Sequence, residues 1–111
     1  MSKVINIINE DFKTEVLDSK IPVLTDFWAP WCQPCLMMAP ILEELSTLMD
    51  GKIKIAKIDT GKIENEKLTA EYHIQSIPNM KLFKDGKVIK EFIGMRDLNT
   101  IKAEIEEAIN D

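Results

Sequence analysis

The only two cysteines of the 111-residue chain, Cys32 and Cys35, are separated by two residues. A disulfide between them would close a very short loop, which restricts the unfolded chain much less than a long loop does. In a secreted domain of this size we would expect disulfides that join distant segments. The pair therefore calls for a chemical explanation rather than a structural one.

The cysteines lie where a buried strand passes into a helix. Residues 22–28 are apolar on both faces, as in a central strand, and helical periodicity begins at Cys35. Cys32 then lies at or just before the helix N-terminus, where unpaired N–H groups and the helix dipole stabilise a thiolate. A thiolate is the nucleophile of thiol–disulfide exchange. Cys35, one turn further on, is placed to attack a mixed disulfide, and Pro34 suits the first helical turn.

A metal site is the main alternative for such a pair. Zinc and iron–sulfur sites usually need four protein ligands. The chain has no other cysteine and only one histidine, His73, so a closed site would need a carboxylate or a second chain. The sequence also has no nucleotide or flavin fingerprint. We therefore expect redox exchange with no metal and no cofactor.

Asp26 is an acidic residue inside the apolar strand, six residues before Cys32. A buried carboxylate is costly unless it is paired or used in chemistry. Burial would raise the pKa of Asp26 and let it exchange a proton with Cys35. Lys57, in the next predicted central strand, is a candidate counter-charge. If the strand is less buried than its pattern indicates, Asp26 is instead a solvated position.

Strands and helices alternate around this site. Hydrophobic patterning predicts strands over residues 3–8, 22–28, 53–58, 80–84 and 87–93. It predicts helices starting near Asn9, over 35–49, over 65–73, and after a capping Asp97. The Asp85-Gly86 pair predicts a two-residue turn between the last two strands. This order indicates an α/β fold with a mixed sheet of about five strands, flanked on both faces by about four helices.

Composition excludes several classes of function. The length suits a single domain over residues 1–111, and 45% hydrophobic residues argue against disorder. With a net charge of −5 and interleaved acids and bases, the chain lacks the basic patch that binds nucleic acid or an acidic membrane surface. No apolar run approaches the roughly 18 residues of a membrane span. Residues 1–11 turn acidic too early for a signal peptide, so we expect a cytoplasmic monomer.

Several motifs together resemble the thioredoxin family. They are the Trp31-Cys32-Gln33-Pro34-Cys35 segment, Asp26, Pro40 in the following helix, Ser76-Ile77-Pro78 before a strand, and Gly94 after the hairpin. The similarity extends over essentially the whole chain, and the order of the elements matches the thioredoxin fold. The resemblance implies a protein-disulfide reductase that cycles between a Cys32–Cys35 dithiol and disulfide. Its implied partners are a thioredoxin reductase, which supplies electrons, and client proteins that contain disulfides.

The resemblance also implies roles for single residues. Cys32 would be the attacking thiol and Cys35 the resolving thiol, with Asp26 as the buried proton acceptor, assisted by Lys57. Pro78 matches the cis-proline that packs beside the disulfide in the family. The positions that would contact substrate are Trp31, Gln33, Pro34, Ile77, Pro78, Gly94 and Met95, with the Ile77 backbone pairing with the substrate chain.

The sequence departs from the family pattern at four places. Gln33 replaces the usual glycine between the cysteines, which we expect to change partner contacts and the redox potential. Leu36 replaces a common lysine and removes a positive charge near Cys32. Asn79 replaces the usual threonine after Pro78, and the loop over residues 59–65 is slightly longer. A more oxidising relative is the closest rival, but it usually carries histidine between the cysteines.

Overall fold

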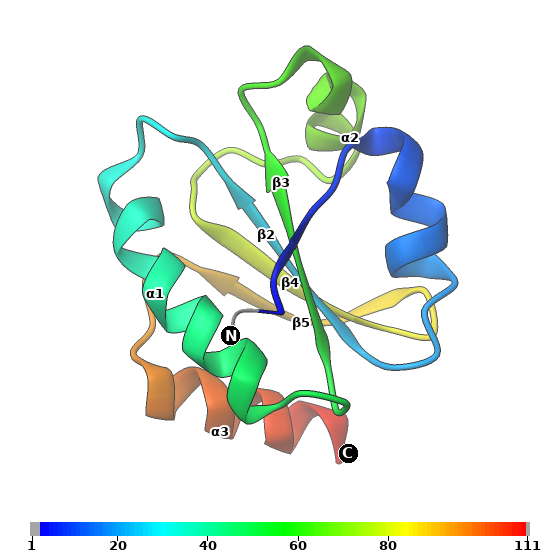
Figure 1. Cartoon of the computed structure of the whole chain (residues 1–111). Coiled ribbons are helices and arrows are strands. Elements are labelled where there is room, and N and C mark those ends of the chain that lie inside the picture. The colour runs from blue at the N-terminus through cyan, green and yellow to red at the C-terminus, as the bar shows by residue number, and fades with distance from the viewer. Residues whose placement is uncertain (1–2, 111) are drawn as a thin grey trace.

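The computed structural model describes residues 3–110, in which five strands form one twisted sheet in the order β1-β3-β2-β4-β5 (Figure 1). The strands are β1 (Ile5–Asn6), β2 (Val23–Trp28), β3 (Lys54–Asp59), β4 (Asn79–Lys84) and β5 (Lys87–Ile93). β3 runs parallel to both β1 and β2, whereas β4 is antiparallel to β2 and to β5. The predicted mixed α/β sheet is confirmed.

Helices cover both faces of this sheet, as predicted (Figure 1). The helices and helical turns are η1 (Asn9–Asp11), η2 (Lys13–Leu17), α1 (Gln33–Leu48), η3 (Ile63–Asn65), α2 (Glu66–Glu71) and α3 (Leu98–Ile109). They make four helical regions, which together with the sheet form the thioredoxin fold. None of the helices within residues 3–110 is long and apolar enough to cross a membrane.

Two apolar cores form because successive side chains of a strand point to opposite faces of the sheet. One core joins the sheet to α1 and α3. Its buried members include Leu24, Met38, Leu42, Leu45, Met80, Leu82, Phe92, Ile101 and Ile105. The other core joins the sheet to the N-terminal turns and α2. Its buried members include Phe12, Val16, Val23, Phe27, Ile58, Leu68 and Phe83.

The N-terminal segment differs from the expectation. β1 spans only two residues, whereas the apolar pattern predicts a strand over residues 3–8. The first helical turn is capped by Ile8 rather than Asn9, because the Asp11 carboxylate accepts a hydrogen bond of 3.1 Å from the Ile8 N–H. Apolar patterning cannot identify this cap, since the side chain that supplies it lies inside the turn.

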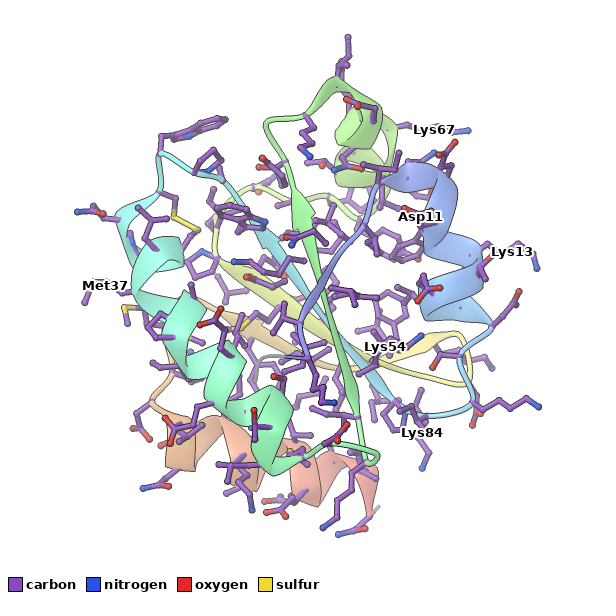
Figure 2. All side chains as sticks on the ribbon, viewed as in Figure 1. Asp11, Lys13, Met37, Lys54, Lys67 and Lys84 are labelled. Carbon is purple, nitrogen blue, oxygen red and sulfur yellow. A yellow bond between two sulfur atoms is a disulfide. The ribbon has the colours of Figure 1, made fainter. Side chains whose placement is uncertain are left out.

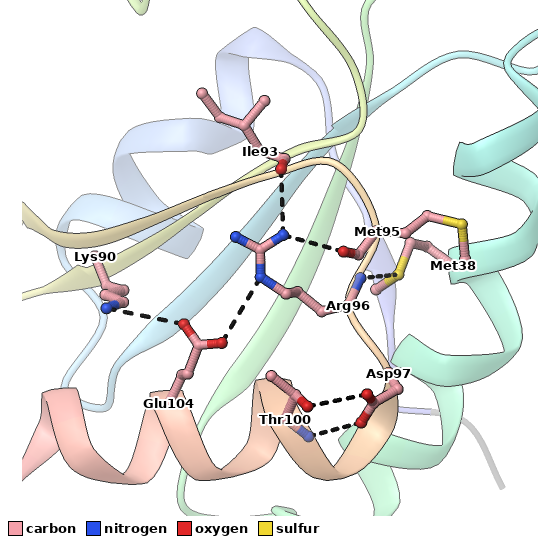
Figure 3. Close-up of polar contacts among 8 residues, drawn as sticks. All are labelled: Met38, Lys90, Ile93, Met95, Arg96, Asp97, Thr100 and Glu104. Atoms are coloured by element: carbon pink, nitrogen blue, oxygen red, sulfur yellow. Dashed lines mark hydrogen bonds and ion pairs between the residues drawn. The ribbon is translucent and has the colours of Figure 1, made fainter.

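The C-terminal hairpin and helix form as predicted. Asp85 and Gly86 both have positive φ, 54° and 78°, as a two-residue hairpin turn requires. Asp97 caps α3 by accepting hydrogen bonds of 2.9 Å from the N–H and the hydroxyl of Thr100 (Figure 3).

The helix predicted over residues 65–73 is shorter in the structure, since α2 ends at Glu71.

Candidate active site

Cys32 and Cys35 form a disulfide at the N-terminus of α1, with their Cα atoms 5.2 Å apart (Figure 2). Cys32 occupies the N-cap position, and its sulfur accepts a hydrogen bond of 3.2 Å from the Cys35 N–H. The Cys32 residue is half-buried, whereas Cys35 is completely buried. Of the two sulfurs, a partner therefore approaches Cys32 more readily.

The first turn of α1 follows from the residues between the cysteines. Pro34 lacks an N–H group, so it leaves no unsatisfied donor in the first turn. The Cys32 carbonyl accepts a hydrogen bond of 3.1 Å from the Leu36 N–H, while the Cys32 N–H donates to the Ala29 carbonyl at 3.1 Å. The N-terminal end of the helix dipole thus lies at the Cys32 sulfur, where it favours a thiolate after reduction.

Asp26 is completely buried in β2, as its place in an apolar strand predicts. Neither carboxylate oxygen has a hydrogen-bond partner among the described residues. Burial penalises the charged form and raises the pKa of Asp26 from 3.8 to about 7, although the nearby Lys57 cation opposes the shift. A carboxyl group with this pKa can take up or release a proton near neutral pH.

Lys57 lies directly opposite Asp26 in the parallel β2–β3 pair. Its Nζ atom is 4.1 Å from the centre of the Trp28 ring, within the range of a cation–π contact. Lys57, the predicted counter-charge, therefore lies opposite Asp26, and its ammonium group also contacts the Trp28 ring.

The segment before β4 approaches the Cys32 sulfur. The Ile77–Pro78 peptide bond is cis, and the Ile77 carbonyl oxygen lies 3.8 Å from the Cys32 sulfur. The Pro78 carbonyl accepts a hydrogen bond of 2.9 Å from the Gly94 N–H. The fold thus brings the cis-proline segment to the Cys32 sulfur at the α1 N-terminus, and Gly94 is hydrogen-bonded to that segment.

Arg96 fixes the segment that follows Gly94 (Figure 3). Its guanidinium group donates to the carbonyls of Ile93 at 3.2 Å and Met95 at 3.0 Å, and its Nε atom lies 3.7 Å from Glu104 in α3. The backbone nitrogen of Arg96 lies 3.5 Å from the Met38 sulfur in α1. These contacts hold the Met95 backbone between α1 and α3.

An apolar surface surrounds the disulfide. The Trp31 side chain is 72% exposed, and Met95 is also exposed. Gln33 and Pro34 are exposed as well, whereas Ile77 and Gly94 are half-buried and Pro78 is buried. The side chains of Leu36 and Met37, in the first turns of α1, are also exposed and apolar; Figure 2 shows Met37 pointing away from the helix.

Gly61 belongs to the surroundings of the site, although its sequence context gives no reason to place it there. A Cβ atom on Gly61 would lie 2.5 Å from Cη2 of the Trp31 ring. The two residues are far apart along the chain and neither belongs to a periodic pattern. The presence of glycine in a loop slightly longer than is common in the family is the only signal in the sequence.

The described part of the chain contains no group of side chains suited to bind a metal ion. Within residues 3–110, no three His, Cys, Asp or Glu side chains group in a way that could hold a metal ion. Both cysteine sulfurs are bonded to each other. Two cysteines that form a disulfide at a helix N-terminus are suited to dithiol–disulfide exchange, and a buried carboxyl group with a pKa of about 7 lies in the strand that leads to them.

Comparison with known proteins agrees with this chemistry. The thioredoxin family model matches residues 3–107. Thioredoxin 1 of Nostoc sp. is 42% identical over 106 residues, which cover 96% of this chain and 97% of that protein. Thioredoxin C-2 of Corynebacterium nephridii is 42% identical, with 96% of each chain covered. The thioredoxin of Haemophilus influenzae is 44% identical over 94 residues, covering 85% of this chain and 86% of the relative.

The matched region includes both cysteines, Asp26 and the cis-proline, so the family relationship and the geometry concern the same site. The chain therefore belongs to the thioredoxin family, and it is a thiol–disulfide oxidoreductase of the protein-disulfide reductase type whose redox-active pair is Cys32 and Cys35.

Proposed function

We propose that Cys32 is the attacking thiol of a cytosolic reductase and that Cys35 is its resolving thiol. The difference in burial between the two cysteine residues carries this assignment, because the half-buried Cys32 is accessible to a partner and the buried Cys35 is accessible only to Cys32. The position of Cys32 at the α1 N-terminus supports it, since the helix dipole favours the thiolate there.

Two exchange steps then transfer one pair of electrons. The Cys32 thiolate attacks one sulfur of a client disulfide, forming a Cys32–client bond and releasing the other client sulfur as a thiolate. The Cys35 thiolate next attacks the Cys32 sulfur, which forms the Cys32–Cys35 disulfide and releases the second client thiolate. The client disulfide is reduced to two thiols, and the dithiol of this protein is oxidised.

Asp26 is the proposed acceptor of the Cys35 proton in the second step. Its pKa of about 7 lets the carboxylate take a proton and return it when the disulfide is reduced again. Lys57, opposite Asp26 on β3, is proposed to adjust this pKa because its positive charge favours the carboxylate. Both are positioned by the sheet rather than by the loop that holds the cysteines.

The surface around Cys32 is the proposed contact for clients and for the reductase. Its members are Trp31, Gln33, Pro34, Ile77, Pro78, Gly94 and Met95. The apolar side chains would rest against an exposed segment of the client, while the Ile77 backbone, 3.8 Å from the Cys32 sulfur, would pair with the client chain as a short strand does.

The proposed partners are a thioredoxin reductase and client proteins with disulfides, in keeping with the family. A nucleotide fingerprint is lacking in the sequence, so electrons are proposed to come from that separate reductase. The proposal takes residues 1–111 as one domain that acts as a monomer without metal or cofactor. The cytosol is the proposed compartment, where thiols are kept reduced.

Trapping of the mixed disulfide tests the assignment of the two thiols. Reduced Cys35→Ser protein should form a stable covalent adduct with insulin, a protein with disulfides, because the resolving thiol is missing. Cys32→Ser protein should form little adduct, since the remaining thiol is buried. Mass spectrometry after acid quenching measures both. Equal adduct formation by the two variants, or adduct only with Cys32→Ser, would contradict the assignment.

A further inference from the structure

The loop between β3 and α2 is tied to the strand that leads to the cysteines. The N–H and the hydroxyl of Thr60 donate hydrogen bonds to the Trp28 carbonyl at 2.8 Å and 3.0 Å. Within the loop, Asp59 accepts from the Gly61 N–H at 2.8 Å through its carboxylate and from the Asn65 side-chain amide at 3.0 Å through its carbonyl. These bonds fix the position of Gly61 relative to the end of β2.

Gly61 lies against the indole ring of Trp31. A Cβ atom on Gly61 would lie 2.5 Å from Cη2 and 2.7 Å from Cζ3 of that ring, closer than side-chain atoms approach one another. The backbone of Gly61 does not lie in the left-handed region, so its conformation does not require glycine. The Trp31 ring can keep this position only while residue 61 has no Cβ atom.

Trp31 is otherwise an exposed side chain next to the reactive sulfur. An exposed indole loses conformational entropy when a partner immobilises it, and this loss weakens binding. A ring that already rests on a fixed backbone loses less. Tryptophan is also among the side chains that contribute most to protein–protein contacts.

We propose that Gly61 is a positioning residue, which seats the Trp31 ring beside Cys32 in the orientation that contacts disulfide-containing proteins. The inference rests on the proposed function of Trp31 as a client contact. Gly61 touches neither sulfur, so it acts only through the ring. Its effect is therefore specific to partners large enough to touch that ring.

The Gly61→Ala variant tests this. Because the ring is exposed, the added methyl group should push it aside without unfolding the protein. The second-order rate constant of the reduced variant with insulin should fall about three- to tenfold, the usual range for a lost aromatic contact. The rate constant with hydroxyethyl disulfide, which is too small to reach the ring, should stay the same. The indole N–H signal of Trp31 should shift in NMR spectra, while that of Trp28 should not.

A double-mutant cycle separates positioning of Trp31 from other effects of the loop. In a Trp31→Ala background the additional Gly61→Ala change should no longer lower the rate constant with insulin. Gly51→Ala serves as a stability control, because Gly51 has a φ of 83° and a Cβ there would meet nothing within 4 Å. It should lower stability and leave the rate constant with insulin unchanged.

Three results would overturn the inference: an unchanged rate constant of Gly61→Ala with insulin, an equal loss with hydroxyethyl disulfide, or a loss that persists without Trp31. Other results would show instead that the proposed function itself is wrong. In that case the wild-type protein itself would not reduce insulin, or Trp31→Ala alone would not slow the reaction.

Discussion

Asp26 and Lys57 are partners across the parallel β2–β3 pair, yet the Lys57 ammonium group lies 4.1 Å from the centre of the Trp28 ring. The Asp26 carboxylate has no hydrogen-bond partner among the described residues. Its pKa is therefore set by two opposing effects, a larger one from burial and a smaller one from the Lys57 charge. This balance keeps the carboxyl group close to its midpoint at neutral pH.

The stability of the protein should depend on pH through Asp26. Its pKa is about 7 in the folded protein and 3.8 without the fold, so between these values the folded state binds more protons than the unfolded state. The free energy of unfolding should then fall as the pH rises through this window, by about 4 kcal/mol in total, and level off above it. Urea unfolding between pH 4 and pH 9 measures this slope.

Asp26→Asn should remove most of the slope, because the amide does not titrate. At a pH above the window the variant should be more stable than the wild type by about 2–4 kcal/mol. Asp85→Asn is the matched control, since Asp85 is exposed in the hairpin turn and asparagine also adopts its positive φ. An Asp26→Asn protein with the wild-type slope would contradict the assignment of this group.

Replacement of Lys57 should raise the pKa of Asp26 further. The Lys57 charge favours the carboxylate, and Lys57→Met removes it while keeping an unbranched side chain over the Trp28 ring. The pKa is measured from the carbon-13 shift of the Asp26 carboxyl group as a function of pH. Lys54→Met, on the same strand but paired with Glu15, should leave this pKa unchanged. A lower pKa in Lys57→Met would refute the prediction.

The midpoint potential of the Cys32–Cys35 couple should lie near that of reducing thioredoxins, about −270 mV. Gln33 is exposed, and histidine, typical of more oxidising relatives, is absent between the cysteines. Equilibration with a dithiol buffer followed by acid trapping gives the value, and Gln33→Gly shows how much the glutamine contributes. A potential near −120 mV, that of a strong oxidant, would exclude the reductase direction.

The Lys81–Glu91 ion pair, which joins β4 to β5, should contribute to the stability of the protein. Their Nζ and Oε2 atoms are 2.6 Å apart, and the side chain of Lys81 is only 6% exposed. Glu91→Ala leaves the ammonium group buried without its partner and should cost about 1–3 kcal/mol. Lys81→Met replaces the charge with an apolar side chain and should change stability by less than about 1 kcal/mol. Chemical denaturation measures both, and equal losses would contradict this interpretation.

Burial of Asp26 and the position of Cys32 could be predicted because both depend on local patterns. An apolar strand on both faces predicts burial of every residue within it, and a strand that leads into a helix predicts an N-terminal cysteine. The cis form of the Ile77–Pro78 bond could be expected only from the family resemblance, because most X–Pro bonds are trans.

Contacts between distant segments could not be predicted in this way. The Gly61–Trp31 contact depends on how the β3–α2 loop folds back to the end of β2, which no periodicity reports. Lys81 is another example, since a lysine in a strand usually marks an exposed position. Its ammonium group is buried because Glu91 lies opposite it on β5.

β5 forms one edge of the sheet, and six of its seven residues are exposed, including Val88, Ile89 and Ile93. Such an edge can pair with the same edge of another molecule and start aggregation. Lys90 is paired with Glu104 and Glu91 with Lys81, which leaves the Lys87 charge to repel a second approaching edge. Because salt screens this repulsion, concentrated protein should remain dispersed longest at low ionic strength.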